Sequence, residues 1–313
     1  MLLSGRFFQY VLMKTAQDTQ GALRSVPERA GDYGNPSAVK ITIIVICIYS
    51  VLAVALIPFA ELPGPEIPGF IAIFTAGILI TELSTAFFLF ALFRHARTWS
   101  LLLLGCAYFY SSLMSLAQVL TFPGAILADQ PLMIASRQST AWIFATWVNG
   151  YALLTLIAVF MEARFSEARI SRKNVRVATV AGLGAVLPAV LTISLVVVLK
   201  SDQLPLLISD LGFTVQSWLV RYLCIAFLYA SIALIFFGMR QPSDLYLWLS
   251  WALTALVFYN VLAAVGGARY SIGWSSGRLS WLLSACAVFV YLLGQFARQQ
   301  RKSIGQHDGP CDD

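Results

Sequence analysis

FIAIFTAGILITELSTAFFLFALF (Phe70–Phe93) is the first of three long apolar runs that decide the fold of this chain. The next two are WSLLLLGCAYFYSSLMSLAQVLTF (Trp99–Phe122) and TAWIFATWVNGYALLTLIAVFM (Thr140–Met161). Each run reaches the roughly 20 residues that a helix needs to cross the hydrocarbon core of a bilayer. The apolar residues are continuous rather than alternating, which is typical of membrane helices and not of barrel strands. Glu82 is the single charged residue in these runs, and it marks a position that lipid would disfavour.

The composition of the whole chain also indicates that the protein lies in a lipid bilayer. Hydrophobic residues make up 59% of the 313 residues, charged residues make up 12%, and the mean hydropathy is +0.77. A soluble domain carries about 25% charged residues. The chain therefore belongs to the integral membrane class, and its net charge of +6 has to be compared with loop positions before any nucleic-acid partner is considered.

Eight runs are long enough to span a bilayer, so we predict an all-α, polytopic membrane bundle of about eight helices. The expected organisation is a polar N-terminal tail (1–38), a membrane domain (39–297) and a short polar C-terminal tail (298–313). The predicted spans are Val39–Leu62, Phe70–Phe93, Trp99–Phe122, Thr140–Met161, Val177–Leu199, Trp218–Met239, Leu245–Val265 and Leu279–Phe296.

The lysines and arginines predict the orientation of these spans. Most of the 21 basic residues lie in the two tails and in the turns on the same side of the membrane as the tails. The positive-inside rule then places both termini in the cytoplasm, and the expected location is a cytoplasmic (inner) membrane. This bias explains the net charge and removes the main support for nucleic-acid binding. The exceptions are Arg137, Lys200, Arg269 and Arg278 on the outer side, and Arg221 inside a span.

Polar residues within or beside the spans form the candidate site. Each needs a polar partner in hydrocarbon, and a shared pocket open to the outer side would satisfy them together. Interhelical hydrogen bonds or ion pairs, such as Glu82–Arg221 or Gln118–Asn149, and a proton path through Glu82 are the alternatives. Aromatic walls are expected from Trp142, Trp147, Tyr151 and Tyr259. The ligand-binding candidates are Glu82, Gln118, Thr121, Trp142, Asn149, Arg221, Asn260 and Arg269.

Two arginines near the end of the chain depart from the positive-inside pattern. Arg269 and Arg278 are predicted to lie in the last outer loop, together with Tyr270 and Trp274. Such a loop could attract an anion or a lipid headgroup, whereas anchoring at the membrane interface is the ordinary role of these residue types.

Several motifs resemble one known family, the membrane-associated sensor domain family of the fourth class. They are TELSTAFFLFALFR (Thr81–Arg94), LTFPG (Leu120–Gly124), STAWIFATW (Ser139–Trp147) and GGARYSIGW (Gly266–Trp274) with the following Gly277, Arg278 and Leu279. The resemblance implies an integral bacterial sensor, usually joined to a cytoplasmic diguanylate cyclase or kinase domain. Family members often carry histidine where this chain has Gln118 and Val148, and aspartate where it has Glu82.

The expected function is a sensory module that binds a small molecule or lipid and signals to a cytoplasmic partner. No span contains a histidine, and no catalytic or metal-binding spacing is present, so we expect neither an enzyme nor a cofactor. No output domain is recognisable after Arg298, which implies a diguanylate cyclase or kinase partner acting in trans, a truncated gene model, or a regulatory decoy. A second copy of the chain is another candidate partner, and a small-solute or proton-coupled transporter is the alternative function.

Overall fold

The computed structural model describes residues 36–67, 69–126, 131–132, 136–209 and 212–307. The expected N-terminal tail therefore lies almost wholly outside the described residues, as does the end of the C-terminal tail. The long helices are α2 (Pro36–Leu56), α3 (Phe70–Ala96), α4 (Trp99–Thr121), α5 (Arg137–Phe165), α6 (Val175–Leu199), α7 (Val215–Ala233), α8 (Asp244–Gly266) and α9 (Ile272–His307).

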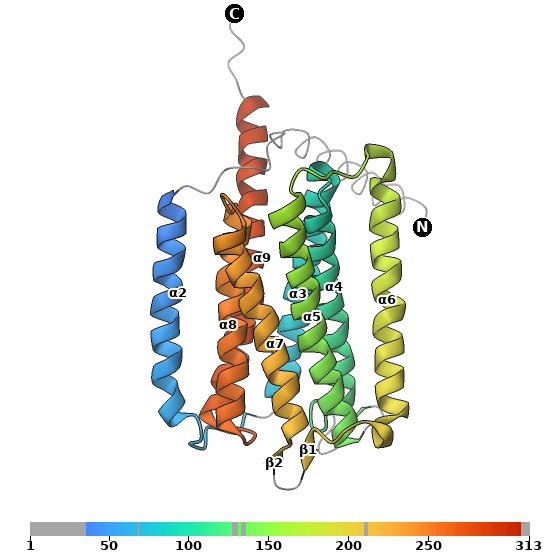
Figure 1. The fold of residues 1–313 in the computed structure, drawn as a ribbon, viewed down its shortest axis with the longest axis vertical. Helices are drawn as coiled ribbons and strands as arrows, with labels where there is room; N and C mark the ends of the chain where they lie inside the picture. The colour runs from blue at the N-terminus through green and yellow to red at the C-terminus, as the bar shows by residue number, and fades with distance from the viewer. Residues whose placement is uncertain (1–35, 68, 127–130, 133–135, 210–211, 308–313) are drawn as a thin grey trace, which may run out of the picture.

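These eight helices run up and down through one bundle, as the continuous apolar runs predict (Figure 1). All eight are long and apolar enough to cross a membrane, so the fold class is confirmed within the described residues. The described chain begins and ends at the same end of the bundle, which an even number of spans requires. Which end faces the cytoplasm stays a prediction.

Short elements complete the connections between the helices. Single helical turns are η1 (Ile57–Phe59), η2 (Arg172–Asn174) and η3 (Ser201–Gln203), and α7 continues into the π-helical η4 (Leu234–Gly238). An antiparallel pair, β1 (Ile208–Ser209) and β2 (Gly212–Phe213), forms a hairpin between α6 and α7. The sequence did not predict this hairpin. It lies at the end of the bundle opposite the described chain ends, and we call that end the hairpin end (Figure 1).

The helices divide into an interior group and a lipid-facing group. In the most apolar window of α4 and of α8, 72% of the residues are buried inside the bundle, compared with 6% for α2 and 17% for α6. Helices α2 and α6 stand at the two flanks in Figure 1. Their exposed isoleucines, leucines and valines are therefore the lipid surface of the domain, and the interior is built around α4 and α8.

Small residues allow the interior helices to approach closely. A Cβ atom on Gly150 would overlap the ring and hydroxyl of Tyr110, so α4 and α5 can cross at this point only with glycine there. The Tyr110 hydroxyl donates a 2.8 Å hydrogen bond to the Thr146 carbonyl, which holds the ring in place. Close approach at glycine is a common device for packing helices in membranes.

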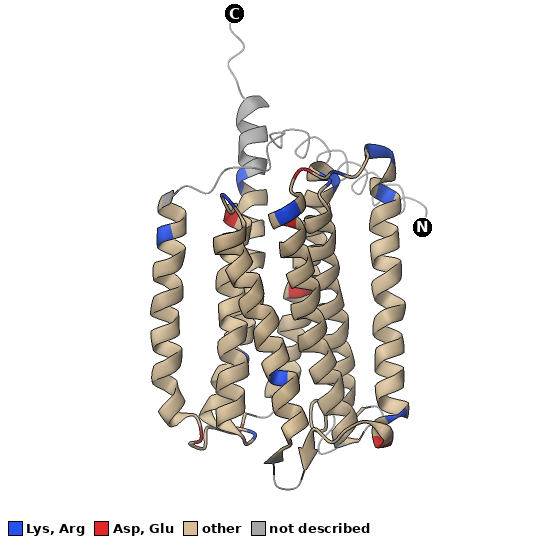
Figure 2. Ribbon diagram, viewed as in Figure 1, with Lys and Arg blue, Asp and Glu red and all other residues tan. Residues whose placement is uncertain are grey.

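Charged residues lie mainly at the two ends of the bundle (Figure 2). Lysine and arginine are concentrated at the end where the described chain begins and ends, in agreement with the distribution used for the orientation. Several boundaries differ from expectation. Helix α7 begins at Val215 and α9 at Ile272, earlier than the predicted Trp218 and Leu279. Helix α9 also continues to His307, past the predicted Phe296 and into the expected C-terminal tail. Arg278 consequently lies inside α9, and its predicted place in the outer loop was wrong.

Candidate functional site

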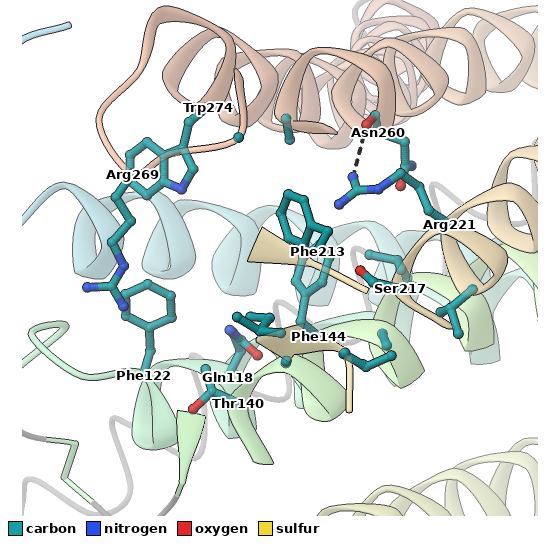
Figure 3. Close-up of a pocket in the computed structure, with 18 of the residues that line it drawn as sticks. Gln118, Phe122, Thr140, Phe144, Phe213, Ser217, Arg221, Asn260, Arg269 and Trp274 are labelled. Atoms are coloured by element: carbon teal, nitrogen blue, oxygen red, sulfur yellow. Dashed lines mark hydrogen bonds between the residues drawn. The ribbon is translucent and has the colours of Figure 1, made fainter. Parts of the chain in front are cut away.

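A cavity of about 780 Å³ lies at the hairpin end of the bundle, within the size range of small-molecule sites (Figure 3). Helices α4, α5, α7, α8 and α9, the β-hairpin and the α8–α9 loop all contribute to its walls. Aromatic rings supply much of the apolar surface, from Phe122, Phe144, Phe213, Tyr259 and Trp274. The polar lining residues are Gln118, Thr140, Asn149, Ser209, Ser217, Arg221, Asn260, Arg269 and Arg278.

The LTFPG segment shapes one corner of this cavity. Helix α4 ends at Thr121, and Gly124 has a φ of 78°, a left-handed conformation that glycine adopts without strain. The Thr140 hydroxyl donates a 2.8 Å hydrogen bond to the Thr121 carbonyl, which joins the end of α4 to the start of α5. Because of this bond, Phe122 and Thr140 are held side by side in the cavity wall.

The QSTAW segment holds the hairpin against the bundle. Helix α5 starts with a capping box, in which Ser136 and Ser139 satisfy each other's backbone N–H groups. One turn later, the Trp142 indole N–H donates a 2.9 Å hydrogen bond to the Pro205 carbonyl. The Gln138 amide also donates to that carbonyl, and its oxygen accepts from the Leu207 N–H at 3.2 Å. These bonds position residues 207–209, which line the cavity.

Arg221 enters the cavity from α7. Its guanidinium donates a 2.9 Å hydrogen bond to the backbone carbonyl of Asn260 on α8, drawn as a dashed line in Figure 3. The same group lies 5.2 Å from the centre of the Phe213 ring and 5.9 Å from that of Trp218, within the range of cation–π attraction. Arg221 therefore contacts a neutral carbonyl and two rings, and these contacts differ from the Glu82–Arg221 ion pair considered as an alternative.

The other two arginines of the cavity lie against aromatic rings. Arg269, in the α8–α9 loop, lies 4.4 Å from the centre of the Phe122 ring (Figure 3). Arg278 lies 3.6 Å from the Trp274 ring and donates a 3.2 Å hydrogen bond to the Trp274 carbonyl one turn earlier in α9. Two cations from the same terminal segment thus reach one cavity, although only one of them is in a loop.

Two amide side chains present acceptor atoms without partners. Gln118 is 7% exposed, and within the described chain its Oε1 atom accepts no hydrogen bond. Asn149 donates to the Ala145 carbonyl at 2.9 Å, while its Oδ1 atom has no partner among the described residues. Unsatisfied buried acceptors are rare in folded proteins and call for an explanation. Both residues line the cavity, so a bound molecule could satisfy them.

Glu82 lies in the core, outside the cavity lining. It is 2% exposed, and its Oε1 atom is 3.5 Å from the Trp281 indole nitrogen, which donates to it. Its Oε2 atom has no partner in the described part of the chain. The neighbouring Trp147 donates a 2.6 Å hydrogen bond to the Ser111 hydroxyl. Glu82 is therefore one layer behind the cavity, within a buried polar and aromatic cluster.

The eight predicted site residues thus fall into two groups. Gln118, Asn149, Arg221, Asn260 and Arg269 all line the cavity. Thr121 and Trp142 position its walls through the hydrogen bonds described above, and Glu82 lies behind it.

Some of the lining was not predicted from the sequence. Phe213 was missed because the hairpin was missed, and Ser217 because α7 begins before the predicted Trp218. Phe144 carries no signal that separates it from other core rings. Of the four predicted aromatic walls, Tyr259 alone lines the cavity, and Trp147 and Tyr151 are buried in the core. Among the described residues, no group of histidine, cysteine, aspartate or glutamate is arranged to hold a metal ion.

Comparison with known proteins agrees with this architecture. The family model described as membrane-associated sensor, integral membrane domain (MASE4) matches residues 65–299, which include every described wall of the cavity. Searches of the curated proteins and of the solved structures found no significant match. A match over most of the chain, together with eight membrane helices, establishes the family. The chain belongs to the MASE4 family of membrane-associated sensor domains.

Proposed function

We propose that this domain senses a small molecule or lipid that binds in the cavity at the hairpin end, and that binding changes helix packing at the opposite end. The observation that carries the proposal is the cavity of this sensor-family domain. Its lining includes Gln118 and Asn149, whose buried side-chain oxygens accept no hydrogen bond from the described residues. Under the predicted orientation, the cavity faces the outer side and the opposite end faces the cytoplasm.

A chain of aromatic contacts supports a route from the cavity into the core. Phe144 and Tyr259 line the cavity, and their ring centres lie 6.1 and 4.8 Å from that of Trp281. Trp281 packs on Trp147 at 4.4 Å and donates to Glu82. Since a closely packed core transmits small displacements, movement of either wall ring would displace Trp281 and with it α9. Helix α9 continues to His307, at the far end of the bundle.

At that far end, hydrogen bonds join two turns that a partner could recognise. The Ile170 N–H donates to the Arg97 carbonyl at 2.8 Å, and the Arg169 guanidinium donates to the Ala96 carbonyl at 3.3 Å. These bonds tie the α5–α6 connection to the α3–α4 turn. The Ser100 hydroxyl also donates to the Glu162 carboxylate, which links α4 to α5. A cytoplasmic diguanylate cyclase or kinase, or a second copy of this chain, would respond to a shift of these turns.

One experiment distinguishes the proposed sensor function from the transporter alternative. The purified full-length chain in phosphatidylcholine nanodiscs is screened for compounds that raise its Tm. Hits are then tested for flux into proteoliposomes. The sensor proposal predicts compounds that bind without being transported. Flux of a hit that requires the protein would contradict the proposal and favour a transporter.

A further inference from the structure

The cavity is cationic, and its described lining residues include arginines but no carboxylate. Arg221 on α7 and Arg278 on α9 both line the cavity, and their hydrogen-bond acceptors are backbone carbonyls. Tyr259 on α8 lines the same cavity. None of the described lining residues is aspartate or glutamate. Among the described lining residues, Arg221 and Arg278 therefore face neutral groups and a third cation, Arg269.

Such an arrangement is costly for an empty cavity and favourable for one that holds an anion. A cation removed from water loses solvation, and a neutral carbonyl replaces little of it. Each guanidinium has several N–H donors. Arg221 uses one of them in its hydrogen bond to the Asn260 carbonyl, and Arg278 uses one in its hydrogen bond to the Trp274 carbonyl. The remaining donors suit a carboxylate or phosphate, which arginine binds with charge-assisted hydrogen bonds.

The wall formed by α4 and α5 has the opposite character. Gln118 and Asn149 line it, and their buried oxygens Oε1 and Oδ1 accept no hydrogen bond from the described residues. A carboxylate or phosphate cannot satisfy an acceptor, so a bound molecule that meets these oxygens when the amides turn into the cavity has to supply N–H or O–H groups. Figure 3 places Gln118 and Arg221 on different walls, with the rings of Phe144 and Phe213 between them. The space between the polar walls is therefore suited to an apolar body.

We propose that the cavity recognises an acid that carries hydrogen-bond donors on an apolar body. Its carboxylate or phosphate binds Arg221 and Arg278, and its N–H or O–H groups bind Gln118 and Asn149. This inference rests on the proposed function, because it assigns a ligand class to the same cavity. The chemistry occurs both in free hydroxylated acids and in the headgroup of phosphatidylglycerol, which joins a phosphate to glycerol hydroxyls.

Three matched probes test the two halves of the proposal in the full-length chain. Binding of para-hydroxycinnamate, para-methoxycinnamate and methyl para-hydroxycinnamate is measured by calorimetry in phosphatidylcholine nanodiscs, with empty nanodiscs subtracted. The acid with a hydroxyl should bind at least about tenfold more tightly than the ester, which has lost the anion, and more tightly than the methoxy acid, which has lost the donor.

Variants locate the effect on each wall. Arg221→Gln and Arg278→Gln should each weaken binding of para-hydroxycinnamate by about tenfold or more, whereas Arg240→Gln, an exposed arginine at the other end of the bundle, should not. Gln118→Met and Asn149→Leu should remove the preference for the hydroxy acid over the methoxy acid and keep the preference for the acid over the ester. The Tm of each variant verifies that it is folded.

An experiment with phosphatidylglycerol distinguishes a lipid ligand from a free acid. Phosphatidylglycerol is added to the nanodiscs, and the lipid retained by the wild type and by Arg221→Gln is measured by native mass spectrometry. Retention that depends on Arg221 identifies the lipid headgroup as a ligand. Binding of para-hydroxycinnamate without such retention identifies a free acid. Either result supports the proposal.

The proposal is overturned if no acidic probe or lipid binds more tightly than its neutral control, or if binding survives unchanged in Arg221→Gln and Arg278→Gln. Failure here is distinguishable from failure of the proposed function. A neutral compound that binds in the cavity and is not transported would leave the sensor function in place. An acid that binds through both arginines and is carried across the membrane would refute the sensor function and keep the ligand class.

Discussion

Arg221 donates its 2.9 Å hydrogen bond to the backbone carbonyl of Asn260, so a cation in the membrane domain is paired with a neutral atom of the neighbouring helix. A structural ion pair would join two opposite charges, and its loss would destabilise the fold. The observed pairing leaves the positive charge without compensation from its carbonyl partner. This is the pattern expected of a residue retained for binding rather than for stability.

Arg221→Gln should therefore leave the Tm of the unliganded protein within about 2 °C of the wild type, or raise it, because the variant no longer has an uncompensated cation. The same variant should lose the Tm increase that a cavity ligand produces in the wild type. Thermal unfolding in nanodiscs measures both effects. If the unliganded variant is several degrees less stable than Arg240→Gln, Arg221 has a structural role and this reading is wrong.

Glu82→Gln should keep the fold and keep ligand binding within about threefold, since the residue lies behind the cavity and an amide oxygen can still accept from Trp281. Calorimetry and thermal unfolding measure the two quantities. Loss of binding with an unchanged Tm would instead place Glu82 in direct contact with the ligand.

Gly150→Ala should destabilise the domain by about 1–3 kcal/mol, because the added methyl group would overlap the ring of Tyr110 and force α4 and α5 apart. Gly184→Ala is the matched control, since a Cβ there meets nothing within 4 Å, and alanine favours a helix. The change in Tm relative to the wild type should therefore differ between the two variants in sign or in size. Equal effects would contradict the described crossing of α4 and α5.

Trp142→Phe should loosen the hairpin, because it removes the hydrogen bond to the Pro205 carbonyl and keeps an aromatic ring. Amide exchange in residues 206–209 should increase by about fivefold, which corresponds to about 1 kcal/mol.

Trp248→Phe provides the control for this experiment. Trp248 packs on Tyr291 near the other end of α8, so its replacement should leave exchange in the hairpin unchanged. Exchange that is equally fast in both variants would show that Trp142 does not hold the hairpin.

The fold could be predicted in large part because the membrane imposes a simple rule on the sequence. A continuous run of about 20 apolar residues has to be a helix in lipid, so Phe70–Phe93 and Trp99–Phe122 were placed almost as the structure has them. The β-hairpin was missed because its pairs are very short and lie outside the apolar runs. The start of α9 was missed because GWSSGR is polar, and its burial depends on contacts with α8 and η1.

The site could be predicted where a polar or charged residue lies within an apolar membrane span. Gln118, Asn149 and Arg221 were identified because lipid disfavours them, and the structure brings all three to one cavity. The same rule also selected Glu82, since sequence cannot distinguish a polar residue that lines a cavity from one that is buried in the core behind it. Phe144 shows the opposite limit. Its ring is ordinary in a membrane helix, and only the positions of α7, α8 and α9 make it a cavity wall.

The most direct test of sensing is whether occupancy of the cavity alters the far end of the bundle. Hydrogen–deuterium exchange of the full-length chain in nanodiscs is compared with and without a compound that stabilises the wild type but not Arg221→Gln. The account predicts slower exchange in residues 206–209 and a changed rate in residues 166–171 and 239–243, which lie in the far turns. Slower exchange confined to the hairpin end, with unchanged rates in the far turns, would contradict it.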